Sequence, residues 1–351
     1  MGVAPAAAPR SAIEGDMADF TADELLRRAD VRGLQFPWEL LAEVVAAVDS
    51  GRHVLLTGPP GVGKTSLAYA LADMARDAVR CTGVVPTTAS AAWDERQTVG
   101  HYIDSPEGVV FQPGIFLDAI HTGRWLLIDE LNRADFDRAF GPFFTVLADQ
   151  PVTLHYRRRG HTEPLSIVPP GAETPPLTDP ITVPRPWRII ATMNDVDRGM
   201  LHRLSYALMR RFAFVEVVAP NDDVVRKLVA GTGELVADLF VVREFVDLGP
   251  GIFIDAAHFA ERRVEDRGTT RSRVLFEAFF AFVLPQLDRL EPGRAWELFD
   301  ALAPRFDGPE VGELERVVAK TIGVARGAHT VDYGASGVPA AGPRTGARNA
   351  T

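Results

Sequence analysis

Polar and apolar residues near the start of the chain predict two helices followed by a strand. Thr21 and Glu24 stand three residues apart, which is the spacing of a helix-capping box, so a helix is expected to begin there. A second helix fits residues 37–50, where the apolar positions share one helical face: Leu40, Leu41, Val44, Val45 and Val48. The short apolar run from His53 to Thr57 instead predicts a buried strand.

Further apolar runs alternate with helical segments. A glycine-rich turn and a helix over about 65–78 follow the first strand, and Trp125–Ile128 and Trp187–Thr192 predict two more buried strands. Continuous apolar strands separated by helices are typical of a mostly parallel sheet that helices cover on both faces. The fold class is therefore predicted to be α/β.

The pattern divides the chain into four segments. Residues 1–20 are rich in Ala, Pro and Gly and are expected to be flexible, and residues 21–218 hold the α/β pattern. Residues 219–326 form a smaller helical domain, in which Asn221 caps one helix and a helix over 274–290 is broken near Pro285. Residues 327–351 are rich in Gly, Ala and Pro and predict a disordered tail.

One stretch inside the α/β pattern is rich in proline. Residues 157–186 contain eight prolines and are predicted to be an irregular inserted loop. The stretch begins with three arginines, Arg157, Arg158 and Arg159. A solvated loop is favoured over a contact with nucleic acid, but the sequence does not decide whether nucleic acid is a partner.

Composition narrows the class of protein. The 351 residues are 46% hydrophobic and carry a formal charge of -10, so the chain has no bulk attraction for nucleic acid or anionic membranes. Cys81 is the single cysteine and cannot form an internal disulfide. No apolar run approaches the roughly 20 residues of a membrane span, and the first residues lack the pattern of a secretory signal. We expect a cytoplasmic protein that is not bound to a membrane.

The glycine-rich turn matches the pattern G-x-x-x-x-G-K-[ST]. Glycines let the backbone curl so that successive N–H groups point at phosphate oxygens, and the following helix adds its positive end. In this pattern the lysine reaches the β- and γ-phosphates, and the hydroxyl of the next residue binds Mg²⁺. The predicted phosphate-binding residues are Gly58, Pro59, Pro60, Gly61, Val62, Gly63, Lys64, Thr65 and Ser66.

Polar residues at the ends of later strands complete a candidate hydrolytic site. Asp129 and Glu130 follow the second strand, where Asp129 would hold Mg²⁺ and Glu130 would polarise an attacking water molecule. Asn194 follows the third strand, where an amide can help to position that water. Arg210 or Arg211 would stabilise charge on the γ-phosphoryl oxygens, an effect worth about 10³–10⁵ in rate.

Taken together, these motifs resemble the AAA+ superfamily, and specifically its McrB-like and dynein-related (AAA_5) branch, to which MoxR-like ATPases are related. The resemblance covers about residues 35–300. Four pieces carry it in the family's order: GPPGVGKT at 58–65, LLIDELNRA at 126–134, ATMNDVDR at 191–198 and ALMRRF at 207–212. The MNxxDR form, with Asp197 and Arg198, is most similar to the McrB-like group.

The resemblance implies a fold and a set of roles. The fold is a P-loop NTPase sheet flanked by helices, the AAA+ core, followed by a smaller α-helical lid. Asp129 and Glu130 would form the Walker B pair, Asn194 would be sensor 1, and Arg210 or Arg211 would reach into a neighbouring subunit's site. Members of the family typically form homo-oligomeric rings, commonly hexamers, and use hydrolysis of ATP with Mg²⁺ to remodel a partner protein or complex.

The chain also departs from the family pattern. Sensor 2 is not evident, because Arg271 and Arg273 match it only weakly. The twenty residues before Thr21 are too few for the DNA-binding domain of McrB-like restriction proteins, so DNA binding is not carried over. ATP follows from the frequency of its use in the superfamily, and GTP stays open because the prototype of the group uses it.

Two other functions are alternatives to an NTPase that remodels a partner. A nucleotide-gated assembly module would hydrolyse slowly or not at all, but Glu130 and the arginine pair argue against it because a pure sensor needs neither. A phosphotransferase for small molecules would share the phosphate loop, but Asn194 and Arg210–Arg211 at family spacing disfavour it.

Overall fold

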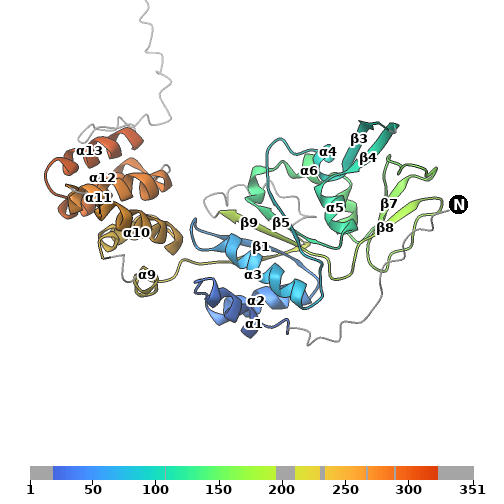
Figure 1. Ribbon diagram of the computed structural model, residues 1–351, viewed down its shortest axis with the longest axis horizontal. Coiled ribbons are helices and arrows are strands. Elements are labelled where there is room, and N and C mark those ends of the chain that lie inside the picture. Colours follow the sequence, from blue (N-terminus) through green and yellow to red (C-terminus); the bar gives the residue numbers. More distant parts are fainter. Residues whose placement is uncertain are drawn as a thin grey trace, which may run out of the picture.

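A computed structural model describes residues 19–106, 108–194, 210–229, 234–265, 268–287 and 290–322 (Figure 1). The chain forms an α/β part, followed by a group of helices that lies to one side of it (Figure 1). Within the described residues, no helix has both the length and the apolar character that a bilayer span requires.

The α/β part is built on a five-stranded sheet in the order β10-β1-β9-β5-β2. All of its neighbouring strands pair in parallel, as predicted. The strands are β1 (His53–Gly58), β2 (Val84–Thr88), β5 (Trp125–Asp129), β9 (Ile189–Asn194) and β10 (Phe212–Glu216). β9 begins and ends two residues later than predicted. Asn194 is therefore the last residue of the strand rather than part of the following loop.

Alternate side chains of the central strands enter two separate cores. Leu55, Leu126 and Ile189 pack into one core, while Val54, Leu127 and Ile190 pack into the other. Because successive side chains of a strand point to opposite faces, a run that is apolar at every position must be covered on both sides. The helices α1 (Ala22–Val31), α2 (Trp38–Asp49) and α3 (Lys64–Asp77) cover one face, and α5 (Ile115–His121), α6 (Phe136–Phe140) and α7 (Phe143–Leu147) cover the other.

The predicted helix starts are confirmed where capping residues were identified. Thr21 accepts a hydrogen bond at Oγ1 from the Glu24 N–H over 3.3 Å at the start of α1. Asn221 accepts one at Oδ1 from the Val224 N–H over 3.0 Å at the start of α9 (Asp222–Leu228). Each side chain satisfies a backbone donor that a first helical turn leaves without an intrahelical partner.

The prediction of an irregular loop over 157–186 is wrong. The stretch contains β7 (Leu165–Val168) and β8 (Asp179–Thr182), which form a three-stranded sheet with β6 (Val152–Thr153). Leu165, Ile167 and Ile181 are buried against the main core. Pro180 fits this arrangement because β8 is an edge strand, where a residue that lacks an N–H interrupts nothing beyond it.

A β-hairpin packs against this small sheet. It consists of β3 (Gly100–Ser105) and β4 (Gly108–Pro113), which follow the short helix α4 (Glu95–Thr98). The rings of Phe111 and Tyr156 are stacked, with centroids 4.8 Å apart, and the Tyr102 hydroxyl accepts a hydrogen bond from the Arg157 N–H over 2.8 Å. The hairpin and the segment between β6 and β7 are therefore joined by a ring contact and a hydrogen bond.

The helical region, residues 222–322, has its own hydrophobic core. After α9 it comprises η3 (Val236–Glu244), α10 (Pro250–Val264), α11 (Arg271–Ala278), η4 (Phe279–Val283), η5 (Leu284–Gln286), α12 (Pro292–Leu302), η6 (Ala303–Arg305) and α13 (Pro309–Ile322). The helix predicted over 274–290 begins earlier, at Arg271. It continues as a π-helical turn from Phe279 and a 3₁₀ turn that contains Pro285, which matches the predicted break.

The end of α3 places a β-branched residue in a left-handed conformation. Val79 has φ of +58°, and its N–H donates to Arg76 O while the Arg80 N–H donates to Ala75 O. This pair of bonds is a Schellman motif, in which glycine normally occupies the position of Val79. The Val79 side chain is 72% exposed and contributes little packing, so the motif carries backbone strain with little compensation.

We predict that Val79→Gly raises the free energy of unfolding by about 0.5–1 kcal/mol, because relief of left-handed strain exceeds the entropic cost of glycine. Urea denaturation measures the change. As a control, Val31→Gly, at an exposed position that ends α1, should lower stability by a similar amount. Destabilisation by both substitutions would contradict the assignment of strain to Val79.

Candidate nucleotide-binding site

The loop between β1 and α3 is shaped by glycine. Gly63 is the N-cap residue of α3 and has φ of +92°, a conformation that residues with a Cβ rarely adopt. A Cβ at this position would lie 3.1 Å from Leu34 Cδ2 and 3.3 Å from Phe36 Cζ. The left-handed backbone and the close approach to the segment between α1 and α2 both favour glycine at position 63.

The Lys64 side chain lies on the inner side of this loop. Its ammonium donates to Gly58 O over 2.8 Å, to Pro59 O over 2.7 Å and to Asn194 Oδ1 over 2.9 Å. Lys64 is only 7% exposed, and a buried cation requires such oxygen partners. The predicted phosphate-loop lysine and the predicted sensor asparagine are thus in direct contact.

A second network joins Thr65, Asp129 and Thr192. Thr65 Oγ1 donates to Asp129 Oδ1 over 2.9 Å, and Thr192 Oγ1 donates to the same oxygen. The Glu130 N–H donates to Thr192 Oγ1 over 3.1 Å, so one buried hydroxyl contacts both acidic residues of the strand end. Hydroxyl and carboxylate oxygens are the ligands that Mg²⁺ prefers, so Thr65 and Asp129 fit the predicted metal site.

Glu130 has an unusual backbone and a charged neighbour. Its φ is +52°, which directs the chain sharply away from β5 into the 3₁₀ turn η1 (Leu131–Arg133). Its carboxylate forms an ion pair with the Arg133 guanidinium. Strained conformations of this kind cluster at functional sites, and Glu130 lines the same cavity as the phosphate loop.

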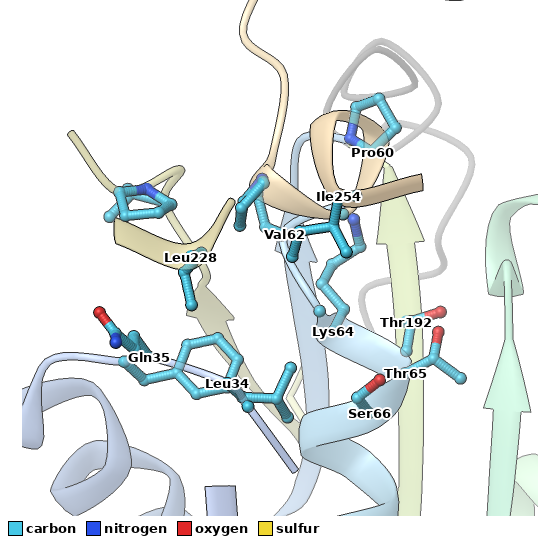
Figure 2. A pocket seen from close by; sticks show the side chains of 18 of the residues that line it. Leu34, Gln35, Pro60, Val62, Lys64, Thr65, Ser66, Thr192, Leu228 and Ile254 are labelled. Atoms are coloured by element: carbon cyan, nitrogen blue, oxygen red, sulfur yellow. The ribbon is translucent and has the colours of Figure 1, made fainter. Parts of the chain in front are cut away.

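These residues surround a cavity of about 410 Å³ with two chemically different ends. Thr65 and Thr192 lie on one side of Lys64, while Leu34, Gln35 and Leu228 lie on the other (Figure 2). Leu34 and Leu228 make this second end apolar, and Phe36, Val218 and Ile254 also line the cavity. A cavity of this size with one cationic, hydroxyl-rich end and one apolar end suits a molecule that joins phosphates to a planar ring.

Several lining residues were not identified from the sequence. Thr192 stands two positions before Asn194 and therefore shares its face of β9, a signal that period-two spacing provides. The residues of the apolar end come from segments that are distant in sequence and carry no motif. They come together only in the folded chain, from the segment after α1, the segment after β10, α9 and α10.

Arg210 and Arg211 do not lie in this cavity. They precede β10, and the Arg211 carbonyl accepts a hydrogen bond from the His53 N–H at the first residue of β1. Because β1 and β10 are parallel, the phosphate loop lies at the opposite end, about 17 Å away along a strand of five residues. Arg211 pairs with Asp149 over 3.0 Å.

The surroundings of this arginine pair are cationic. The pKa of His53 is lowered to about 3, first by burial and then by the charges of Arg188, Arg211 and Arg52. An imidazole in this place stays neutral at neutral pH, so the positive field at this end of the sheet comes from guanidinium groups.

The two weak sensor 2 candidates lie elsewhere. Arg271 pairs with Asp238 over 2.9 Å, and Arg273 pairs with Glu277 and Glu313, each over 2.9 Å. Neither arginine lines the cavity, so the structure does not support the sensor 2 assignment. Asp197 and Arg198 lie outside the described residues.

Comparisons with known proteins match this region. A family model described as AAA domain (dynein-related subfamily) covers residues 53–212. The chain is 27% identical over 195 residues to the EcoKMcrB subunit of the type IV methyl-directed restriction enzyme of Escherichia coli (strain K12), which covers 52% of this chain and 39% of that protein. It is 32% identical over 108 residues to midasin of Dictyostelium discoideum, which covers 30% of this chain and 2% of midasin.

These relatives are longer proteins, and the chain spans less than half of the length of either. Among solved structures, NtrX from Brucella abortus in complex with ATP matches 84% of this chain and 71% of that chain, with a TM-score of 0.43 and 18% identity. A likeness this loose carries no argument about fold or ligand.

The match at 53–212 contains the phosphate loop, the acidic strand end and Asn194, which the parallel sheet brings to one edge. The predicted family is confirmed. Residues 53–212 are a AAA domain of the dynein-related subfamily, similar in sequence to McrB and midasin, in a superfamily whose members are generally ATPases.

Proposed function

We propose that this chain binds ATP with Mg²⁺ in the cavity, hydrolyses it at a site shared between subunits of a homo-oligomer, and uses the cycle to remodel a partner protein or complex. The observation that carries the proposal is the meeting of two networks. Lys64 contacts Asn194, and Thr65 contacts Asp129, at the same edge of the sheet. The first pair supplies charge for phosphates, and the second supplies oxygen ligands for Mg²⁺.

Each residue then has a defined part in hydrolysis. The Lys64 ammonium exchanges loop carbonyls for β- and γ-phosphate oxygens, and Asn194 is near enough to hold the attacking water. Water forms a bond to the γ-phosphorus as the bond to the β,γ-bridging oxygen breaks. Glu130 orients the water and, as general base, accepts the proton that the water loses, which then passes to solvent. ADP and inorganic phosphate leave.

A neighbouring subunit completes the proposed site. Within one chain, Arg210 and Arg211 are separated from the phosphate loop by the length of β10, so they cannot contact a nucleotide bound there. Arg211 borders a cleft together with exposed Arg52 and Arg185, and Arg210 is itself exposed, so the charge of the pair lies at the surface. An arginine pair in this position can act on the nucleotide of an adjacent copy. This supports a ring, and a hexamer is the size that the family resemblance favours.

The apolar end of the cavity favours adenine over guanine. Guanine presents an N1–H and an exocyclic amino group, which require an acceptor such as a carboxylate. Among the described lining residues, the only carboxylates are Asp129 and Glu130, which lie at the phosphate end. Gln35 is the one described side-chain amide at the apolar end, and its single carbonyl oxygen matches the one donor group of adenine but not both donor groups of guanine.

A nucleotide-gated module with little hydrolysis is the second candidate. The ion pair between Arg133 and Glu130 favours it, because a carboxylate held by a guanidinium is less available to water. Such a protein would bind ATP, assemble and turn over slowly.

The first prediction concerns Glu130. Glu130→Gln should lower steady-state ATP turnover at least about 100-fold, since an amide is a poor general base, while the dissociation constant for ATP stays within about threefold. Glu39→Gln, at an exposed position of α2, is the matched control and should change neither value. Unchanged turnover in Glu130→Gln would favour the gated module.

The second prediction concerns the arginine pair. ATP turnover per subunit should rise with protein concentration, because each site needs a neighbouring subunit. The double substitution Arg210→Ala/Arg211→Ala should lower this turnover about 10³-fold without weakening ATP binding. Arg27→Ala, at a side chain 71% exposed on α1, is the control. If turnover per subunit does not change with protein concentration or with the double substitution, the site is complete within one chain and the shared site is contradicted.

The third prediction concerns the base. In competition against a fluorescent ADP, ATP should bind at least about tenfold more tightly than GTP. Gln35→Glu should narrow that ratio because its carboxylate accepts from both guanine donors. Equal affinities in the unchanged protein would refute the adenine preference.

A further inference from the structure

The helical region contacts the phosphate loop backbone to backbone. The Gly249 N–H donates to Pro60 O over 2.9 Å, and the Gly251 N–H donates to Gly61 O over 2.9 Å. Gly249 is the N-cap residue of α10, and Gly251 lies in its first turn. We call these two hydrogen bonds the α10 clasp.

The clasp provides hydrogen-bond acceptors for backbone N–H groups at the start of α10. The first N–H groups of any helix lack intrahelical acceptors, and a capping side chain usually supplies one. Gly249 offers no side chain, and Pro250 at the first helical position has no N–H. The N–H groups of Gly249 and Gly251 instead find acceptors in the phosphate loop, which caps the helix in place of a side chain.

The clasp also orients the loop. In a planar trans peptide, the C=O of one residue and the N–H of the next point in opposite directions. With Pro60 O and Gly61 O directed at α10, the N–H groups of Gly61 and Val62 are directed away from it. In loops of this pattern, backbone N–H groups contact the phosphates, so the clasp fixes the direction of two such donors.

Space at the contact explains why glycine stands at both positions. A Cβ on Gly249 would overlap Gly61 C and Val62 N, and a Cβ on Gly251 would lie 2.9 Å from Gly61 O. Gly249 itself has φ of −77° and ψ of 165°, which any residue adopts. The close approach, and not the backbone conformation, therefore requires glycine at position 249.

From this contact we infer that Gly249 and Gly251 are positioning residues for nucleotide binding: the α10 clasp fixes the loop amides that receive the phosphates, and so couples their affinity to the placement of the helical region. The inference rests on the proposed function, because it assumes that the loop binds a nucleotide. Linkage makes the coupling reciprocal, so bound phosphates in turn favour the clasped position of α10.

The direct test compares glycine substitutions in the full chain. Gly249→Ala should weaken binding of MgATP and of inorganic pyrophosphate by about tenfold each, because misaligned amides lose charge-assisted hydrogen bonds to phosphate. Pyrophosphate reports on the loop alone, without the base. Gly251→Ala should act in the same direction more weakly. Gly312→Ala, where a Cβ meets nothing within 4 Å in α13, should bind both ligands normally.

A second measurement tests the clasp without any nucleotide and without a mutation that might unfold the chain. In the unchanged protein, the amides of Gly249 and Gly251 should exchange with deuterium far more slowly than amides of exposed loops. Exchange at loop rates, or full affinity in Gly249→Ala, would overturn the inference. If the amides of Gly249 and Gly251 are protected but the chain binds no nucleotide, the proposed function is contradicted and the clasp is only a structural contact.

Discussion

The buried ammonium of Lys64 is the constraint on which the rest of the site depends. A charge that is 7% exposed is tolerated only with oxygen partners around it, and these come from the end of β1, from the loop itself and from the end of β9. Those partners meet because parallel strands bring their carboxyl ends to one edge of the sheet. The same edge carries Asp129 and Thr192, so the pairing of the strands also determines where a metal ion can be held.

Sequence patterns predicted this edge well because the strands are buried on both faces. A short uninterrupted apolar run such as Leu126–Ile128 is typical of a central strand. A glycine-rich loop that ends in Lys64 is typical of phosphate binding. The parallel sheet and the helices that follow it were expected from those patterns, whereas the direct contacts of Lys64 with Asn194 and of Thr65 with Asp129 were not.

Other parts of the chain escaped prediction for identifiable reasons. The stretch 157–186 was mistaken for a loop because proline counts against strands, although an edge strand tolerates Pro180. The apolar end of the cavity was missed because Leu34, Leu228 and Ile254 belong to three separate segments. Contacts of this type depend on tertiary packing, and no local spacing reports them. The same holds for Gly249, whose requirement for glycine arises from a loop far away in the chain.

The cap that α10 receives has a consequence for how the chain reaches its final form. Acceptors for its first amides lie in a loop that leaves the ribosome long before the helix does. A contact of such large sequence separation forms late, because closing a long segment of chain costs entropy before the contact returns any stability. During synthesis, the phosphate loop must therefore exist for a time with the Pro60 and Gly61 carbonyls still turned to solvent. A AAA domain of this design matures as a binding site only after α10 has been synthesised.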